Sequence, residues 1–426
     1  MTAPQPRKPR GISGRVSKAA SGKLFVLIIT NFVDMVGLLM IIPLMPFYAR
    51  EMGGGALIVA ILMSSFTAAQ LMSAPLWGRF SDRYGRRPAL LVGLTASCIA
   101  YVVFAFANSI WLLLLSRIVQ GAGGGTVGVI QAYVADSVEP DSRAKALGWL
   151  SAATNVGVAI GPAIGGAALK FGRSGPGLAA ASLCLVNIYF AWKFLRESRD
   201  MSEAHEKKPR ASRTVIAHVI AHPGAPAPRL IWIYAIAMGA FSGLMAILAL
   251  FLADRFGVGK DRIWVFYTYV GAISVVTRAG ILGRMVDRYG EAQLSRIGLV
   301  LLATGLTALG FAGGYVSLAI SVALIPLGTA FTFPCVTSML SRVISSRERG
   351  LYMGVQQTFG GLSRVIIPLW AGFSYDHFGK TVPLFTSAAL VFGTLALGFG
   401  IDDGRKEPVP GAWYPVPEKG EHEAGS

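Results

Sequence analysis

The sequence predicts an all-α membrane protein made of two similar bundles of six membrane-spanning helices. Of its 426 residues, 53% are hydrophobic and only 14% are charged, which favours a chain buried in lipid over a set of soluble domains. Apolar segments of roughly 20 residues, the length a helix needs to cross a bilayer, recur along the whole chain. The string GRFSDRYGRR at 78–87 returns 205 residues later as GRMVDRYG at 283–290, so the two halves are related by duplication.

The apolar segments give the order of the elements. The first six predicted spans lie at 24–47, 57–77, 89–107, 110–135, 145–169 and 176–195. The second six lie at 230–253, 263–282, 294–313, 316–341, 351–374 and 381–401. They predict an N-terminal bundle over 24–195 and a C-terminal bundle over 230–401. A basic cytoplasmic tail (1–23) precedes the first bundle, and a polar tail (402–426), which we expect to be disordered, follows the second.

Residues 196–229 form the predicted cytoplasmic linker between the bundles. The segment is charged at its start and rich in Pro and Ala at its end. Within it, TVIAHVIAH at 214–222 allows two interpretations. One is a short amphipathic helix on the membrane surface, and the other is a solvated tether.

The net charge of +17 would suggest nucleic-acid binding in a soluble protein, but the placement of the charges indicates a membrane topology instead. Counted along the predicted spans, 29 of the 39 Lys and Arg residues fall in the loops and tails of one side. Basic residues gather on the cytoplasmic side of multi-pass proteins. We therefore expect both termini in the cytoplasm, a location in the plasma membrane (the bacterial inner membrane) and no nucleic-acid partner.

Cysteine and histidine placement argues against catalysis and against a metal site. Cys98, Cys184 and Cys335 lie in three separate predicted spans, and the five histidines lie in the linker, a loop and the C-terminal tail. The glycine-rich string GAGGGTVG at 121–128 lies inside a predicted helix and lacks the GK[ST] of a phosphate-binding loop. We expect no enzyme activity and no cofactor, so that an ion gradient must drive any uphill movement of a solute.

Three motifs resemble those of the major facilitator superfamily, within it the drug:proton antiporters and nearest the tetracycline-efflux group. The family's motif between helices 2 and 3 is matched by Gly78, Asp82, Arg83, Gly85, Arg86 and Arg87, with Phe80 where Leu is usual. The helix 4 motif is matched by Arg117, Gln120, Gly121 and Gly123, and the end of that helix by Tyr133–Asp136. The antiporter motif of helix 5 is matched by Gly157, Gly161, Pro162, Gly165 and Gly166.

The resemblance covers nearly the whole chain and implies the major facilitator fold. It also implies a secondary transporter that exports drug-like or amphipathic small molecules in exchange for protons by alternating access. A proton-coupled uptake symporter or a metabolite exporter of the same fold is the alternative. The implied partners are a small-molecule substrate, protons and the lipid bilayer, and we expect a monomer.

The resemblance also implies a conformational switch in the repeated motif. In similar carriers, the acid at position 82 caps a helix of the opposite half when the carrier faces outward, and the arginine at 86 pairs with the acid at 136. A carboxylate is stabilised at the positive end of a helix, which makes the capping physically reasonable. The second copy of the motif contributes Asp287 and Arg288. The sequence further predicts tight turns at Gly78 and Gly85.

Glycines 157, 161 and 165 recur every four residues and share one helix face, so a neighbouring helix can approach at backbone distance. Pro162 breaks one backbone hydrogen bond in the same helix. The motif alone allows either tight packing or a moving interface. In similar antiporters this face lies between the two halves, which implies a conformational role.

Four charged residues are predicted within the hydrocarbon, where each costs about 2.5–3.5 kcal/mol on insertion scales. Asp34 matches the acid of the antiporters' helix 1, and Arg117 matches its basic partner in helix 4. Burial disfavours a charged carboxylate and a nearby guanidinium favours it, so alternating access would load and release a proton at Asp34. The alternatives are a cation-substrate site at Asp34 or a static Asp34–Arg117 pair. Arg278 and Arg364 would either bind an acidic substrate group or extend their charged ends toward the membrane surface.

Polar side chains and a flexible methionine in the spans are candidates for lining a permissive substrate cavity. The alternative is ordinary packing and hydrogen bonding between helices. The candidates are Asn31, Met35, Gln70, Gln131, Asn155, Gln356 and Gln357, together with Arg278 and Arg364.

Overall fold

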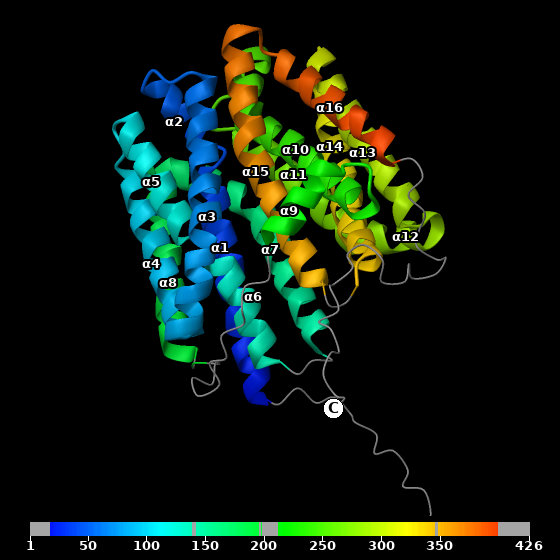
Figure 1. Ribbon diagram of the computed structural model, residues 1–426. Helices are drawn as coiled ribbons and strands as arrows, with labels where there is room; N and C mark the ends of the chain where they lie inside the picture. The colour runs from blue at the N-terminus through cyan, green and yellow to red at the C-terminus, as the bar shows by residue number, and fades with distance from the viewer. Residues whose placement is uncertain (1–17, 139–141, 196, 198–211, 346–347, 399–426) are drawn as a thin grey trace, which may run out of the picture.

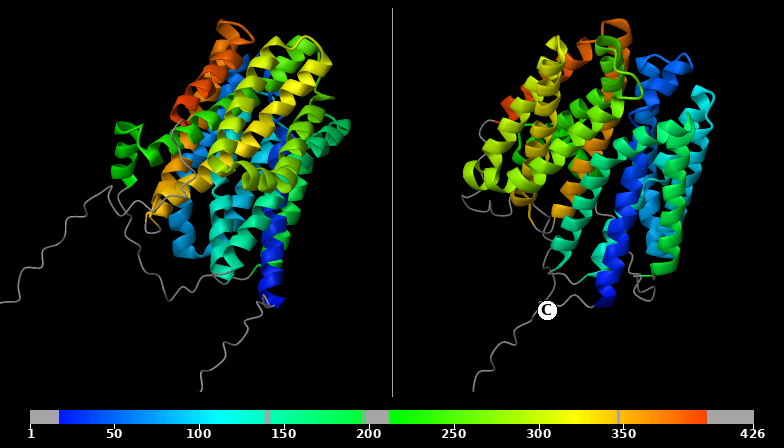
Figure 2. Two further views of the ribbon diagram at one scale, coloured as in Figure 1. Left: turned by 90° about the vertical axis from the view of Figure 1, so that its right-hand side faces the viewer. Right: turned by 180° about the vertical axis from the view of Figure 1, so that it is seen from behind.

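The computed structural model describes residues 18–138, 142–195, 197, 212–345 and 348–398. Helices run along one common direction in two neighbouring bundles, the N-terminal half in blue to teal and the C-terminal half in green to orange (Figures 1 and 2). The predicted C-terminal tail and most of the basic N-terminal tail lie outside the described residues.

The N-terminal half contains six spans, two of which are interrupted. Its helices are α1 (Lys18–Ile41), α2 (Met45–Glu51), α3 (Ala56–Tyr84), α4 (Arg86–Ala105), α5 (Ile110–Gly123), α6 (Thr126–Ser137), α7 (Arg143–Ala168) with the 3₁₀ turn η2 (Leu169–Phe171), and α8 (Gly175–Phe194). The first span breaks between α1 and α2 next to Pro43, and the fourth breaks at Gly124 and Gly125. Proline and glycine are the residues expected at such breaks.

The C-terminal half repeats this arrangement. Its helices are α10 (Pro226–Phe256), α11 (Ile263–Val276), the π-helical turn η4 (Thr277–Ile281), α12 (Leu282–Tyr289), α13 (Glu291–Phe311), α14 (Tyr315–Val343), α15 (Arg349–His377) and α16 (Val382–Gly398). Among the described residues, ten spans are long and apolar enough to cross a membrane, and α16 is a shorter apolar helix. With α15, these elements confirm the predicted all-helical fold of two six-span bundles.

The repeated motif is mostly helical rather than a loop. Gly78 lies inside α3, so the predicted turn at this residue is wrong. Only Gly85 stands between α3 and α4, at φ 100°, and Gly290 stands in the same way between α12 and α13, at φ 76°. One glycine in this left-handed region is enough to end one helix and begin the next.

The linker contains the helix α9 (Ser212–Ala221), which packs against α10 and α15. Val215 and Val219 are buried, and the Trp232 Nε1 of α10 donates to the Val219 carbonyl at 3.1 Å. The helical interpretation of 214–222 is therefore correct for this segment. The bundle covers Val215 and Val219, whereas Ile220 is 60% exposed.

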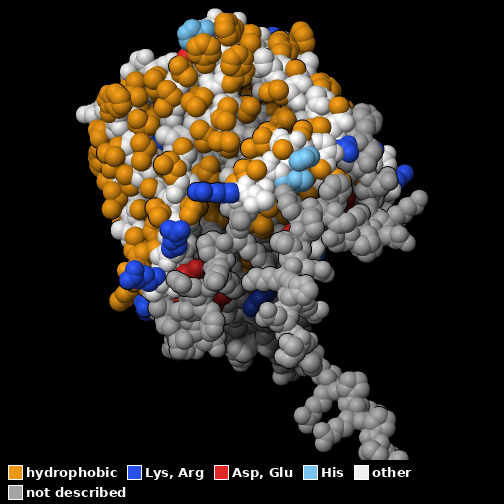
Figure 3. Space-filling view, in the orientation of Figure 1, with side chains coloured by type: hydrophobic (Ala, Val, Ile, Leu, Met, Phe, Trp, Pro, Cys, Tyr) orange, Lys and Arg blue, Asp and Glu red, His pale blue; other side chains and the backbone are white. Residues whose placement is uncertain are grey.

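The two halves meet along two helix pairs, α3 with α15 and α7 with α11. Outside these contacts, large apolar side chains cover the wall of the bundle, as Figure 3 shows for one face. Met72 and Trp111 are each 78% exposed. A hydrophobic outer wall of this extent is what a lipid environment requires.

Candidate functional site

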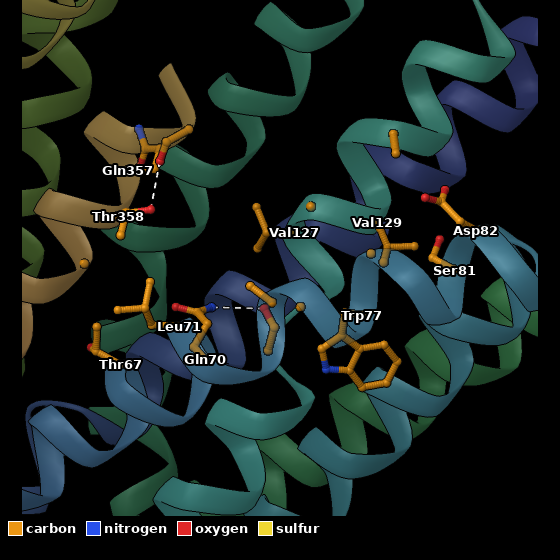
Figure 4. Close-up of a pocket in the computed structure, with 18 of the residues that line it drawn as sticks. Thr67, Gln70, Leu71, Trp77, Ser81, Asp82, Val127, Val129, Gln357 and Thr358 are labelled. Carbon is orange, nitrogen blue, oxygen red and sulfur yellow. Dashed lines mark hydrogen bonds between the residues drawn. The ribbon is translucent and has the colours of Figure 1, made fainter. Parts of the chain in front are cut away.

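A cavity of about 590 Å³ lies between the halves, bounded by α3, α4 and α6 on one side and by α15 on the other. Leu71, Ala74, Val127 and Val129 give it an apolar wall, and Gln70, Gln357 and Arg364 contribute polar groups. Figure 4 shows Gln70 and Gln357 on facing helices, with Ser81 and Asp82 at the far end of α3. The cavity thus extends to the end of the bundle that carries the repeated motif, here named the motif end.

The cavity contains three of the predicted lining residues, namely Gln70, Gln357 and Arg364. Asn31 is 1% exposed and donates to the Leu150 carbonyl at 3.2 Å and to Thr154 Oγ1 at 2.6 Å. Gln356 is fully buried between helices. The expectation that Asn31 and Gln356 line the cavity is therefore wrong, because both side chains are buried between helices. Asn31 bonds within its own half, whereas the Nε2 of Gln356 has no hydrogen-bond partner among the described residues.

The other predicted lining residues lie elsewhere. Met35 packs against Gly157, and Gln131 is exposed on α6. Arg278 donates a hydrogen bond to Asn155 across the two halves. Thr67, Trp77 and Thr358 do line the cavity but carry no sequence signal, since Thr and Trp are ordinary residues of membrane helices.

Asp34 lies on α1 in the middle of the N-terminal half. Its Oδ2 is 3.5 Å from the Oγ1 of Thr126, the first residue of α6. The break at Gly124 and Gly125 therefore sets the beginning of a helix beside this carboxyl group. The positive end of a helix stabilises a carboxylate, and this environment changes if α6 moves relative to α1.

Arg117 on α5 is 1% exposed and does not form an ion pair with Asp34 in the described structure. Its guanidinium lies over the Phe104 ring at 5.6 Å, and its Nε and Nη2 have no hydrogen-bond partner. The alternative of a static Asp34–Arg117 pair is therefore contradicted. Tyr101 lies within electrostatic reach of both groups, a connection that the sequence analysis missed.

Arg278 and Arg364 come from the C-terminal half. Arg278 belongs to the π-helical turn η4, and its Nη1 donates to Asn155 Oδ1 on α7 at 3.0 Å. Arg364 belongs to α15 and lines the cavity. Both guanidiniums lie within electrostatic reach of Tyr234 on α10, whose hydroxyl oxygen is 3.5 Å from Gln357 Nε2.

The first copy of the repeated motif is tied into the N-terminal half. Arg86 Nε lies 3.0 Å from Asp136 Oδ2, and Arg86 Nη1 lies 2.9 Å from Asp82 Oδ1. The backbone N–H groups of Arg86 and Arg87 donate to the Glu197 carboxylate at 2.9 and 3.0 Å. The structure thus brings Asp82, Arg86 and Asp136 together, while Arg83 lies over the ring of Tyr84 at 5.4 Å.

The second copy differs in its charges. Asp287 is exposed, and the Arg288 guanidinium lies over the Tyr289 ring at 5.5 Å. The ion pair that matches Arg86–Asp136 in position is Glu291–Arg342, at 2.7 Å, with the signs exchanged between the helices. The duplication therefore keeps, in both halves, an ion pair between one mostly buried and one more exposed side chain at this place.

Contacts between the halves seal the end opposite the motif end. The Asp376 carboxylate of α15 accepts from the backbone N–H groups of Ala56 and Leu57, at 3.0 and 2.8 Å, and so caps α3. Arg50 binds Asp254 through two bonds of 2.7 and 3.0 Å. Lys260 Nζ lies 2.6 Å from Glu51 Oε1. The described conformation is thus closed at this end, while the cavity reaches the motif end.

The glycine face of α7 lies against α1 of the same half. A Cβ added at Gly157 or Gly161 would meet the backbone and Cβ atoms of α1, as would one at Gly165. The expectation that this whole face lies between the halves is therefore wrong. Of the four glycines of the motif, Gly166 is the one whose added Cβ would meet the other half, at Trp264 of α11.

The comparisons with known proteins place the chain in a family. The model of the Major Facilitator Superfamily matches residues 27–368 and 279–424. The tetracycline resistance protein, class B, of Escherichia coli is 26% identical over 359 residues, which cover 83% of this chain and 88% of that protein. Multidrug resistance protein 2 of Bacillus subtilis (strain 168) is 25% identical over 356 residues, which cover 83% of this chain and 89% of that protein.

Among solved structures, the human organic anion transporter MFSD10 (TETRAN) matches with a TM-score of 0.68 at 22% identity. The match covers 89% of this chain and 99% of that chain. At this level of identity the similarity shows a shared fold. Together, the comparisons confirm the predicted resemblance to drug-resistance members of the superfamily.

Proposed function

Because the chain belongs to the Major Facilitator Superfamily, we propose that it exports drug-like or amphipathic small molecules in exchange for protons. The observation that carries the proposal is the cavity between the halves, which reaches the motif end while ion pairs and a helix cap close the opposite end. The excess of Lys and Arg at the motif end supports a cytoplasmic location for this end. The described conformation is then the one that collects substrate from the cell interior.

Asp34 is the proposed proton carrier. It lies within the hydrocarbon span of α1, next to the start of α6, and Arg117 does not neutralise it directly. Movement of α1 relative to α6 would alter how well a charge at Asp34 is stabilised. The side chain would release its proton when the cavity faces the cytoplasm and take one up when the cavity faces outward.

The repeated motif is proposed to hold the alternative, outward-facing state. Asp82 is 58% exposed at the mouth of the cavity, where it pairs with Arg86 in the described conformation and where a helix of the other half would reach it in the outward-facing one. Arg86 and Asp136 would keep the motif in position. A cap and an ion pair of this kind contribute about 1 kcal/mol, enough to shift a two-state population roughly fivefold.

In this proposal the protein works as a monomer in the bacterial inner membrane with both termini in the cytoplasm. Asp34 replaced by Asn tests it most directly, because Asn keeps the shape and cannot carry a proton. A susceptibility panel that includes tetracycline first identifies a compound tolerated better by expressing cells than by empty cells. In everted vesicles whose lumen is more acidic than the medium, this compound should dissipate the gradient with the unchanged protein and not with Asp34→Asn.

Asp261→Asn is the matched control, since Asp261 is an exposed acid in the loop before α11. It should behave as the unchanged protein does. An Asp34→Asn variant that still dissipates the gradient would remove Asp34 from proton coupling. Accumulation of the compound in intact cells, rising with its outside concentration, would favour the uptake symporter.

A further inference from the structure

We propose that the substrate carries an anionic group, a carboxylate or sulfonate, that Arg364 binds this group in the cavity, and that Arg278, which lies outside the lining of this cavity, attracts it. The inference rests on the proposed function in one respect, namely that this cavity is the substrate path. It commits the site to amphipathic organic anions. A permissive apolar cavity alone would make no such selection.

The first observation is the lack of partners for these two guanidiniums. Among the described residues, Arg364 forms no ion pair and no hydrogen bond, and its buried Nε has no acceptor. Arg278 uses one of its five N–H groups for Asn155, and its buried Nε also has no acceptor. Partly buried guanidiniums without acceptors are costly, so a ligand that supplies acceptors is stabilised there.

The second observation is the contrast with other arginines of the chain. Arg50, Arg86 and Arg342 each lie within 3.0 Å of a carboxylate oxygen. The structure places no acidic side chain in an ion pair with Arg278 or Arg364 within the described ranges. The C-terminal half therefore carries two positive charges without an acidic partner among the described residues, Arg364 in the cavity wall and Arg278 on η4.

The third observation is the position of Arg364 beside Gln357. The two residues are seven positions apart on α15, so they share one face, and both line the cavity. The Tyr234 hydroxyl lies 3.5 Å from Gln357 Nε2. A guanidinium and an amide, with a phenol next to the amide, thus lie beside an apolar wall.

This arrangement fits a molecule with an apolar body and one anionic end. Leu71, Ala74 and Val127 would contact the body, while the planar guanidinium of Arg364 would donate paired hydrogen bonds to the two oxygens of a carboxylate. A cationic compound would be repelled by the same group. The bond from Arg278 to Asn155 crosses the halves, so an anion that engages Arg278 also competes with an interdomain contact.

The test compares three probes with the same ring: 2-naphthoate, its methyl ester and 2-naphthylmethylammonium. Binding is measured at equilibrium with the purified full-length protein in detergent, without any gradient. We expect 2-naphthoate to bind more tightly than the ester and the ester more tightly than the ammonium compound. Arg278→Gln and Arg364→Gln should each weaken binding of the naphthoate roughly tenfold or more and leave that of the ester unchanged.

Arg262→Gln is the control, because Arg262 is an exposed loop residue, and it should leave all three affinities unchanged. Arg364→Lys should recover part of the naphthoate affinity. The unchanged ester affinity shows that each Gln variant is folded. Naphthoate binding that is no tighter than ester binding, or equal losses for all three probes in the Gln variants, overturns the inference.

The binding assay separates this inference from the proposed function. Charge-selective binding that depends on both arginines, together with an absence of proton exchange in vesicles, would leave the anion site standing and reject the export function. Proton exchange that depends on Asp34, without preference for the anionic probe, would do the reverse. Asp34→Asn should keep the naphthoate affinity within about twofold, since Asp34 lies in the other half and contacts Thr126.

Discussion

Gly161 shows at the scale of one residue how the sequence sets the distance between two helices. A Cβ at this position would lie 2.8 Å from the Cβ of Leu39 and 2.9 Å from the Val36 carbonyl oxygen, both on α1. Helix backbones that come this close gain van der Waals contact over their whole length. The glycine is therefore required by the approach of α1, since a helical φ allows any residue.

Gly161→Ala should destabilise the protein by about 1–3 kcal/mol, because the added methyl group must push α1 away from α7. Thermal unfolding of the purified protein in detergent measures this as a lower midpoint. Gly148→Ala, in the same helix with nothing within 4 Å of the added Cβ, should raise the midpoint slightly or leave it unchanged. Equal midpoints for the two variants would contradict the close packing seen here.

The candidate site was only partly predictable at this scale. Asp34 and Arg364 stand out because a charge in an apolar segment is costly and therefore conspicuous. Tyr101, Thr126 and Tyr234 lie beside those charges but are ordinary in a membrane helix, so only the fold reveals them. Asn31 was misjudged for the opposite reason, because a polar residue in a span is as often satisfied by a neighbouring helix as by a ligand.

Elements show the same division between what the sequence predicts and what it does not. All twelve spans were predicted, since runs of apolar residues dominate the pattern. The break before α2 and the π-helical turn η4 were not, because a helix with an irregular turn keeps the same composition. Residues to which we assign functional roles nevertheless lie at these irregular turns, with Arg278 in η4 and Thr126 directly after the break at Gly124 and Gly125.

A contact between two helices at the closed end involves an acid whose spacing from two glycines matches that of the repeated motif. Gly372, Asp376 and Gly379 have the spacing of Gly78, Asp82 and Gly85, but they lie at the opposite end of the bundle. Asp376 caps α3 across the halves, with two charge-assisted hydrogen bonds. We infer that the acid at 376 stabilises closure of its own end, as the acid at 82 is proposed to do at the motif end.

Asp376→Asn should weaken this closure by about 1–2 kcal/mol, because the amide carries no charge and offers a single acceptor oxygen. The population open at that end should then rise roughly fivefold to thirtyfold. Spin labels on cysteines introduced at the exposed residues Asn108 and Asp261 report the distance between the halves there, since the three native cysteines are buried. Glu348→Gln, at the other end of α15, is the control and should leave the distance distribution unchanged.

The whole molecule combines a duplicated scaffold with chemistry that is divided between the halves. Both halves repeat the positive-φ glycine and an ion pair next to it, Arg86–Asp136 in one and Glu291–Arg342 in the other. The acid within the hydrocarbon lies in the N-terminal half, and the two arginines without an acidic partner among the described residues, Arg278 and Arg364, lie in the C-terminal half. Proton and anion would thus bind to opposite walls, so that rocking of one half against the other acts on both.

This division predicts how transport responds to the membrane potential. Export of a monovalent anion in exchange for one proton moves two charges per cycle, whereas export of a neutral molecule moves one. Each charge gains about 2.3 kcal/mol per 100 mV. An inside-negative potential of about 100 mV therefore favours export of the anion by about 4.6 kcal/mol and export of the neutral molecule by about 2.3 kcal/mol. Efflux from preloaded spheroplasts, with the potential set by potassium and valinomycin at equal pH, should therefore rise more steeply with potential for 2-naphthoate than for 2-naphthalenemethanol. Spheroplasts with Asp34→Asn give the leak to be subtracted, and parallel responses of the two probes would show that the carried charge does not contribute to the driving force.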